Sequence, residues 1–193
     1  MPQEKKTYQI IKEQDIYMKK RIIFLEIALL LAAISFAQES DTLNIRDENG
    51  LKQGLWEETR QDRFNYDVEC RFNYLNDKKN GYGVCYFEDG SVFFHGTYLN
   101  GILHGEFIEF HYNGLPSIVE TYSEGVLHGK TMRLWDNGDT VTLKNYYRGE
   151  PHGITKEYKS GRLWFESIYE YGREIKRIYY RRKGQVKKIL EFG

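Results

Sequence analysis

The sequence predicts an all-β protein, an elongated antiparallel meander of about six stacked β-hairpins of 23–24 residues each. Three observations predict this fold. The dipeptide His-Gly recurs every 24 residues, a second glycine follows it at a nearly constant distance, and one tyrosine per unit occupies an equivalent position. Self-similarity at a fixed period is the signature of a repeat architecture. The aromatic content of 16% also excludes a disordered chain, because disordered chains are depleted in aromatic residues.

Each repeat is anchored on a glycine. The anchors are Gly81, Gly105, Gly129 and Gly153, and the last three follow a histidine. A second glycine comes nine residues after the first three anchors and eight residues after the fourth. A degenerate first unit starts near residue 50 and a degenerate last unit ends near residue 184, so we assign residues 49–193 to the repeat domain and residues 38–48 to an N-terminal lead.

Each unit is interpreted as a hairpin. Asp89-Gly90, Asn113-Gly114 and Asn137-Gly138 are dipeptides that favour primed two-residue turns, in which both central residues have positive φ. The residues three and five positions after the anchor are mostly apolar, such as Ile108 and Phe110, and the residue between them is mostly polar, such as Glu109. This alternation is typical of a strand with one buried face.

A column of aromatic residues marks the second strand of every unit. Stacked hairpins would place these rings in a row on one face of the sheet. They would then act either as core, stabilised by cross-strand aromatic contacts, or as a stripe that binds a partner. The column consists of Tyr74, Tyr98, Tyr122, Tyr146, Tyr169 and Phe192, at steps of 24, 24, 24, 23 and 23 residues.

The segment from Tyr86 to Gly105, with Asp89-Gly90, Tyr98 and Gly101-Ile102-Leu103-His104-Gly105, resembles the MORN repeat. Its 24-residue spacing is similar to that of the bacterial YwqK-like proteins, a subgroup labelled antitoxins. The likeness covers residues 49–193 and is most specific between 77 and 161. It implies a twisted meander of hairpins that acts as a scaffold or binds proteins, sometimes with lipid involved. The antitoxin label implies neutralisation of a partner toxin.

The N-terminal region has the three parts of a secretory signal peptide in residues 18–37: the basic Lys19-Lys20-Arg21, an apolar run over 22–37, and a small-residue end at Ser35-Phe36-Ala37. Cleavage after Ala37 would export the chain to the periplasm or the extracellular space. The alternative is an uncleaved membrane anchor, although a spanning helix needs roughly 20 apolar residues and this run has 16. Residues 1–17 are either a misread gene start or an extended n-region of the signal peptide.

The two cysteines, Cys70 and Cys85, are candidates for a disulfide. An exported chain meets an oxidising compartment, where disulfides persist. Cys70 lies in the outgoing strand of the first hairpin and Cys85 in the ingoing strand of the second, at equal distances from the loop that connects them. Antiparallel neighbours at such positions face each other closely enough to be bridged.

No reaction, metal or cofactor is predicted. The repeated histidines would stand about 10 Å apart, because each hairpin adds two strands at about 4.8 Å. A zinc ion needs nitrogen ligands at about 2.1 Å, so we interpret His104, His128 and His152 as turn residues. The glycines mark turns and not a phosphate loop. We therefore expect a non-catalytic protein.

Charge separates the two ends of the chain. The formal net charge is zero, which argues against a nucleic-acid partner. Residues 39–69 hold nine acids and four bases, a net of −5, whereas residues 172–193 hold eight bases and two acids, a net of +6. The basic end is either a solvated cap on the last strand or a docking patch for an anionic partner. Its cations are Arg173, Lys176, Arg177, Arg181, Arg182, Lys183, Lys187 and Lys188.

We expect an exported repeat scaffold that binds a protein partner through a face of its sheet. The contact candidates are Phe107, His111, Arg133 and Trp135. A second hypothesis attaches the basic end to anionic lipid or another envelope surface and makes the array a spacer. A third is an antitoxin or immunity protein. The identity of the partner and the oligomeric state do not follow from the sequence.

Overall fold

The computed structural model describes residues 43–61 and 67–193. The predicted signal segment at 18–37, residues 1–17 and residues 38–42 of the N-terminal lead lie outside the described residues. Residues 44–193 form one compact unit, and the fold below is that of this unit. In the part of the chain that the structure describes, no helix is long and apolar enough to cross a membrane.

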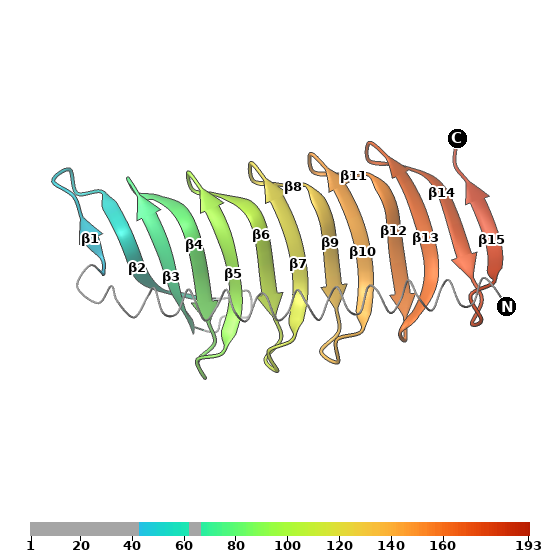
Figure 1. The fold of residues 1–193 in the computed structure, drawn as a ribbon, viewed down its shortest axis with the longest axis horizontal. Helices are drawn as coiled ribbons and strands as arrows, with labels where there is room; N and C mark the ends of the chain where they lie inside the picture. Colours follow the sequence, from blue (N-terminus) through green and yellow to red (C-terminus); the bar gives the residue numbers. More distant parts are fainter. Residues whose placement is uncertain (1–42, 62–66) are drawn as a thin grey trace. The chain divides into compact units, whose positions relative to one another are not determined.

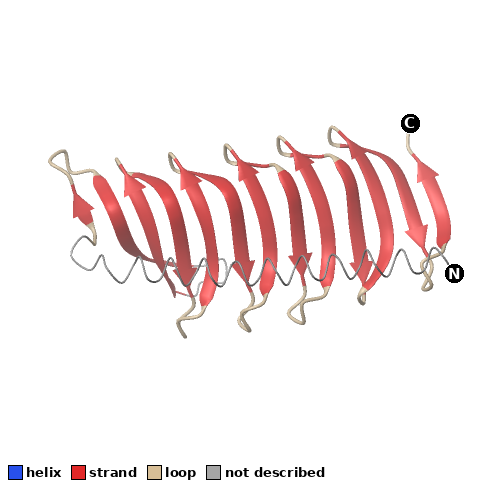
Figure 2. Ribbon diagram, in the orientation of Figure 1, coloured by secondary structure: helices blue, strands red, loops and turns tan. Residues whose placement is uncertain are grey.

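The described residues form one antiparallel sheet of 15 strands in meander order, which confirms the all-β fold of stacked hairpins (Figures 1 and 2). Six hairpins follow one another: β2–β3, β4–β5, β6–β7, β9–β10, β12–β13 and β14–β15. The short strands β1, β8 and β11 pair in antiparallel fashion with β2, β7 and β10, respectively. The strands are β1 Ile45–Arg46, β2 Lys52–Gln61, β3 Asp67–Leu75, β4 Lys78–Tyr86, β5 Val92–Leu99, β6 Ile102–Phe110, β7 Pro116–Ser123, β8 Val126–Leu127, β9 Gly129–Leu134, β10 Thr140–Tyr147, β11 Glu150–Pro151, β12 Gly153–Lys159, β13 Arg162–Glu170, β14 Arg173–Tyr180 and β15 Val186–Glu191.

The loops within hairpins differ from the prediction. Gly90 donates its N–H to the Phe87 carbonyl at 2.9 Å, Phe87 donates to the Ser91 carbonyl at 2.8 Å, and Gly90 has a φ of +82°. Asp89, Asn113 and Asn137 do not have positive φ. These loops are therefore type I turns followed by a left-handed glycine, and the prediction of primed two-residue turns at these dipeptides is wrong. The physical reason is local: the Asp89 carboxylate accepts the N–H of Ser91 at 2.9 Å and stabilises the turn without positive φ at Asp89.

The primed turns lie at the opposite rim, where they join successive hairpins. Both central residues have positive φ at Asn100-Gly101, at 53° and 91°, and at Glu124-Gly125, at 53° and 81°. The second residue of each turn also donates its N–H to the preceding hairpin: Gly101 to the Lys79 carbonyl at 2.8 Å, and Gly125 to the Leu103 carbonyl at 2.9 Å. Arg148-Gly149 and Tyr171-Gly172 repeat the arrangement. These bonds couple each turn to the repeat before it.

The shorter spacing of the fourth unit has a simple cause. Ser160 and Gly161 both have positive φ, at 51° and 68°, so β12 and β13 are joined by a two-residue turn instead of the longer loop. One residue fewer in the loop brings the second glycine eight residues after its anchor. The irregular step in the sequence is therefore a change of turn type within an unchanged sheet.

Each later hairpin carries a β-bulge at an equivalent place. Cys85 pairs with Phe94 and Tyr86 with Val92, which leaves Phe93 as an extra residue. The same shift makes Ser117, Val141, Trp164 and Lys187 the extra residues of β7, β10, β13 and β15. Bulges increase the local twist of a sheet, and here they repeat along the array with the period of the sequence.

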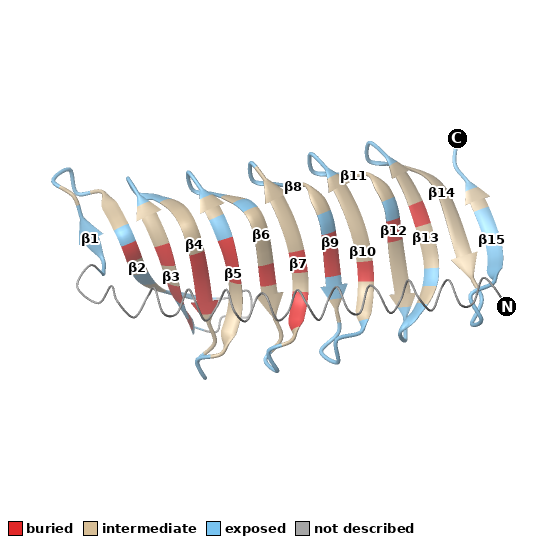
Figure 3. Cartoon of the chain, viewed as in Figure 1, coloured by how far each residue is buried: buried red, intermediate tan, exposed pale blue. Residues whose placement is uncertain are grey.

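The buried residues lie in a band across the middle of the strands (Figure 3). On one face, cross-strand pairing lines up an aliphatic row of Val84, His95, Ile108, Val119 and Met132, all less than 9% exposed. On the other face, Cys70, Phe72 and Cys85 are buried with Val68 in one cluster. The predicted alternation of apolar and polar residues in the first strand of each unit therefore produces the aliphatic row.

Candidate functional site

The register places the predicted tyrosine column on a single face of the sheet. Directly paired residues of an antiparallel ladder share a face. Four of the column residues pair with the anchor glycines, as in Tyr98 with Gly81 and Tyr122 with Gly105, and Tyr74 pairs with Gly54. We call the side of the sheet that carries this column the tyrosine face. It also carries the buried cluster of Cys70, Phe72 and Cys85, and lies opposite the aliphatic row.

Three tyrosines of the column contact a second aromatic ring edge-on. The ring centroids lie 6.2 Å apart for Trp56 and Tyr74, 5.6 Å for Phe72 and Tyr98, and 6.4 Å for Phe107 and Tyr122. T-shaped pairs of this kind contribute about 0.5–1.5 kcal/mol beyond the burial of area. The tyrosines are partly buried, so the column is neither a closed core nor a fully exposed stripe.

Glycine makes room for the large rings. A Cβ placed on Gly83 would lie 2.3 Å from Phe72 Cδ1, and one on Gly96 would lie 3.0 Å from Phe107 Cδ2. Gly83 pairs with Phe72 and Gly96 pairs with Phe107, so a large residue on one strand lies against a glycine on the next. This complementarity of size leaves room for each phenyl ring against the neighbouring strand.

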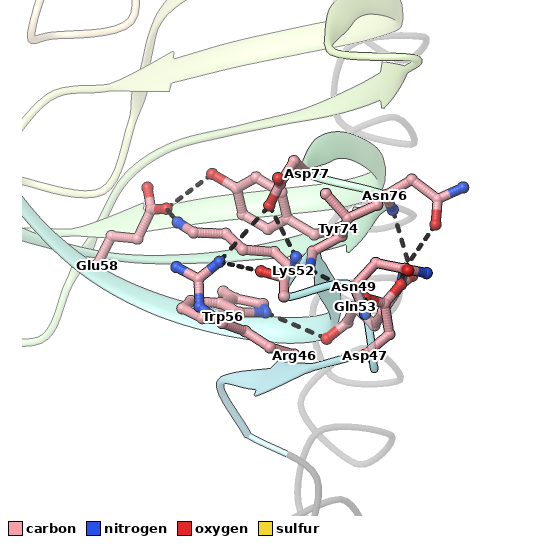
Figure 4. A network of polar contacts seen from close by, with 12 residues as sticks. Arg46, Asp47, Asn49, Lys52, Gln53, Trp56, Glu58, Tyr74, Asn76 and Asp77 are labelled. Atoms are coloured by element: carbon pink, nitrogen blue, oxygen red, sulfur yellow. Dashed lines mark hydrogen bonds and ion pairs between the residues drawn. The ribbon is translucent and has the colours of Figure 1, made fainter.

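A polar network holds the N-terminal end of the tyrosine face (Figure 4). Glu58 Oε1 accepts hydrogen bonds from Lys52 Nζ and from the Tyr74 hydroxyl, both at 2.7 Å. Burial alone would raise the pKa of Glu58, but the hydrogen bonds from Lys52 and Tyr74 outweigh it and lower the pKa. Burial, and then the bond to Glu58, raises the pKa of Tyr74. Lys52 Nζ also lies 4.4 Å from the centroid of the Trp56 ring.

Similar pairings recur further along the face. The Tyr122 hydroxyl donates to Glu120 Oε2 at 2.7 Å, and burial followed by this bond raises the pKa of Tyr122. Arg177 binds Glu174 through two hydrogen bonds of 2.7 Å and reaches Ser167 Oγ at 3.2 Å. The face therefore presents tyrosine rings set among carboxylates and cations, with the hydroxyls of Tyr74 and Tyr122 already fixed as donors.

The structure joins Cys70 and Cys85 in a disulfide. The two residues are direct cross-strand partners on β3 and β4, and the bridge lies in the buried cluster beside Phe72. The described residues contain no free cysteine. The bridge connects the first two hairpins on the tyrosine face.

The four contact candidates are not one patch. Phe107 and Arg133 lie on the tyrosine face, because they pair with Glu120 and Ile118, two residues apart on β7. Trp135 starts the loop that follows β9 and is 55% exposed. His111 lies next to β6, where its Nε2 is 3.1 Å from the Leu134 carbonyl oxygen, so this ring contacts the neighbouring repeat.

The basic candidates divide into two groups. Arg177 and Lys176 are paired with Glu174 and Glu191, at 2.7 Å and 3.1 Å. The other six are exposed, and the structure gives them no ion pair within residues 43–61 and 67–193. They are Arg173 at the start of β14, Arg181, Arg182 and Lys183 in the loop before β15, and Lys187 and Lys188 on β15.

The repeated histidines lie at the rim where the primed turns join the hairpins. His152 contacts Tyr171, with ring centroids 4.9 Å apart, and its Nδ1 accepts the Tyr171 N–H at 3.3 Å. His128 lies 5.4 Å from the Tyr147 ring. Within the described ranges, no three His, Cys, Asp or Glu residues are grouped as metal ligands would be.

Sequence reasoning missed two positions of the first repeats. Lys79 Nζ lies 3.0 Å from the centroid of Phe72, and burial, followed by the charge of Arg60, lowers its pKa to about 8. His95 is buried in the aliphatic row between Tyr82 and Phe110, and its Nε2 has no hydrogen-bond partner. The contact between Lys52 and Glu58 could have been expected from the sequence. The two residues are separated by an even number of positions along one strand, which places their side chains on the same face.

No family model matches the chain, and no curated protein matches it either. The resemblance to the MORN repeat stays a prediction from the sequence.

Proposed function

We propose that this protein is a non-catalytic, exported repeat scaffold that binds a protein partner through its tyrosine face. The observation that carries the proposal is the register, which places one tyrosine from each of five hairpins, together with Phe107 and Arg133, on the same side of one sheet. Tyrosine and arginine are enriched at the centres of protein interfaces. The Cys70–Cys85 disulfide supports export, because such bridges persist in oxidising compartments.

The shape of the surface also favours a protein over a small ligand. Small molecules bind in concave pockets that bury most of their surface, whereas an interface of standard size needs about 800 Å² on each partner. The column recurs every second strand, at about 10 Å, so four steps extend it over about 40 Å. A row of that length offers repeated, similar contacts to an extended surface.

The test is an affinity capture from the cell envelope fraction with the purified protein as bait. We expect Arg133→Glu to lower the affinity for the captured partner by about tenfold or more, a loss of about 1.4 kcal/mol. Ile154→Ala is the matched control, since Ile154 is 47% exposed and lies on the opposite face. Equal losses in Arg133→Glu and Ile154→Ala would contradict the assignment to the tyrosine face.

A second candidate function is attachment to anionic lipid through the basic end. Arg181, Arg182 and Lys183 are consecutive, exposed and lack an ion pair among the described residues, and Val186 and Ile189 nearby are 52% and 49% exposed. We expect binding to phosphatidylglycerol vesicles that weakens with salt. Replacing the three cations by Gln should lower it by about 100-fold, at about 1 kcal/mol for each charge. Binding that salt does not change would contradict this function.

A further inference from the structure

The strand β15 is an edge of the sheet. Among the described residues it pairs with β14 alone, whereas the second strand of every earlier hairpin pairs on both sides. Five of its six residues are exposed, including Ile189. A strand paired on one side presents main-chain donors and acceptors that another strand can bind.

The hydrogen-bond phase identifies which main-chain groups face outward. Phe192 donates its N–H to the Ile175 carbonyl at 3.0 Å, so Phe192 is bonded toward β14. Residues bonded to one neighbour alternate with residues directed away from it in an antiparallel ladder. Leu190 therefore faces β14 as Phe192 does, and the N–H and C=O groups of Ile189 and Glu191 face away from it.

The earlier hairpins show that such an edge accepts a strand. β5 and β13 have bulges at Phe93 and Trp164, equivalent to the bulge of β15 at Lys187. Both strands nevertheless pair along their outer edge with the next hairpin, through Phe94 with Glu109 and through Phe165 with Tyr179. The bulge of β15 is thus compatible with a further strand.

Charge selects the kind of strand. Arg181, Arg182, Lys183, Lys187 and Lys188 surround the edge, and all five lack an ion pair within residues 43–61 and 67–193. Glu191, the one acid of β15, is 3.1 Å from Lys176. Like charges on facing strands are destabilising and opposite charges are stabilising, so a basic strand or a second copy of β15 is disfavoured.

We propose that β15 binds an extended, acidic segment of a partner protein as an added β-strand. Main-chain hydrogen bonds to Ile189 and Glu191 provide the affinity, and the cations around the edge provide the selectivity. Edge lysines also protect a sheet against indiscriminate pairing. The two roles agree, because lysines that repel neutral and basic strands attract an acidic one. This site is separate from the tyrosine face and does not depend on its function.

The test uses a blocked peptide of alternating Glu and Val at low salt. We expect it to bind the full chain and to slow amide hydrogen exchange at Ile189 and Glu191. The amides of Lys188 and Leu190 should change little, because both already face β14. Lys187→Glu combined with Lys188→Glu should lower the affinity by about tenfold, whereas Lys130→Glu, an exposed change on β9, should not.

Three outcomes would overturn the proposal. One is equal binding of a Lys-Val peptide, which would show that charge does not select the strand. Another is binding without protection of Ile189 and Glu191. The third is binding of phosphatidylglycerol vesicles but not of the acidic peptide, which would assign the basic end to a lipid surface. A failed capture by the tyrosine face would leave all three readouts unchanged.

Discussion

The hairpins of the tyrosine face share one backbone arrangement, but the side chains beside the tyrosine column differ between the first and the last hairpins. In the first hairpins the space beside the column holds Phe72, Phe107 and the Cys70–Cys85 disulfide. In the last hairpins the equivalent space holds Ser167, Thr155 and Arg177. Phe72 and Ser167 occupy the same position in their repeats and can be compared directly. Each lies two residues before its column tyrosine, and both are 0% exposed.

The difference shows that turns and anchor glycines, and not the residues between them, define the hairpin. A phenyl ring against glycine and a serine bonded to an arginine both fit the same position. Burial of a large apolar side chain stabilises by about 1.5–3 kcal/mol, whereas a net hydrogen bond contributes about 0.5–1.5 kcal/mol. We therefore expect stability to concentrate in the first hairpins and the polar half to hold less of it.

Among the changes that test this comparison, Phe72→Ala is expected to lower the free energy of unfolding most. The change removes a fully buried ring between Gly83, Tyr98 and the disulfide, and should lower the free energy of unfolding by about 3–5 kcal/mol. Denaturant unfolding measures it. A loss below about 1 kcal/mol would show that the first hairpins are no more tightly packed than the last.

Reduction of the Cys70–Cys85 bridge is the next largest. The cysteines are 15 residues apart, and a closed loop of this length stabilises by about 3 kcal/mol. We expect the midpoint of denaturant unfolding to fall on reduction and in the Cys70→Ala, Cys85→Ala double variant by similar amounts. A protein whose midpoint is the same with and without reductant would contradict the prediction.

Acid should weaken the first hairpins through His95. Burial lowers the pKa of His95 to about 4 in the folded chain, against about 6.5 when unfolded. The unfolded chain then binds more protons between these values, so stability is full above pH 6.5 and falls as the pH decreases toward 4. At pH 5 the loss is about 2 kcal/mol. His95→Phe should remove this part of the pH dependence in unfolding measured from pH 8 to pH 5, and parallel curves for the two proteins would refute it.

The smallest effect is expected for Ser167→Ala. It removes the hydroxyl that accepts a hydrogen bond from Arg177 Nε at 3.2 Å, while Arg177 keeps its two bonds to Glu174, so the loss should be about 1 kcal/mol. Thermal unfolding of Ser167→Ala and Phe72→Ala, measured side by side, compares the same repeat position in the last and the first hairpins. A loss as large as that of Phe72→Ala would mean that the polar half is as tightly coupled as the aromatic one.

The sequence by itself determined the repeat and the fold class. Glycines at a constant step require turns, and the tyrosine column has one register that places it on one face, so the meander of six hairpins was predictable. Turn geometry was only partly predictable. The dipeptide Asp89-Gly90 suits a primed turn as well as a type I turn followed by a left-handed glycine. The hydrogen bond from the Ser91 N–H to the Asp89 carboxylate decides in favour of the type I turn.

Only the tertiary structure decided what lies beside each element. The pairing of Phe72 with Gly83, the burial of His95 and the outward phase of Ile189 depend on register between strands, which one-dimensional spacing does not contain. The same holds for the six cations of the last hairpin that have no ion pair within residues 43–61 and 67–193. The sequence has eight bases there, but only the fold pairs Lys176 and Arg177 with carboxylates and leaves five of the others around the edge strand β15. Periodicity thus fixes the backbone of a repeat array, and contacts across strands fix its chemistry.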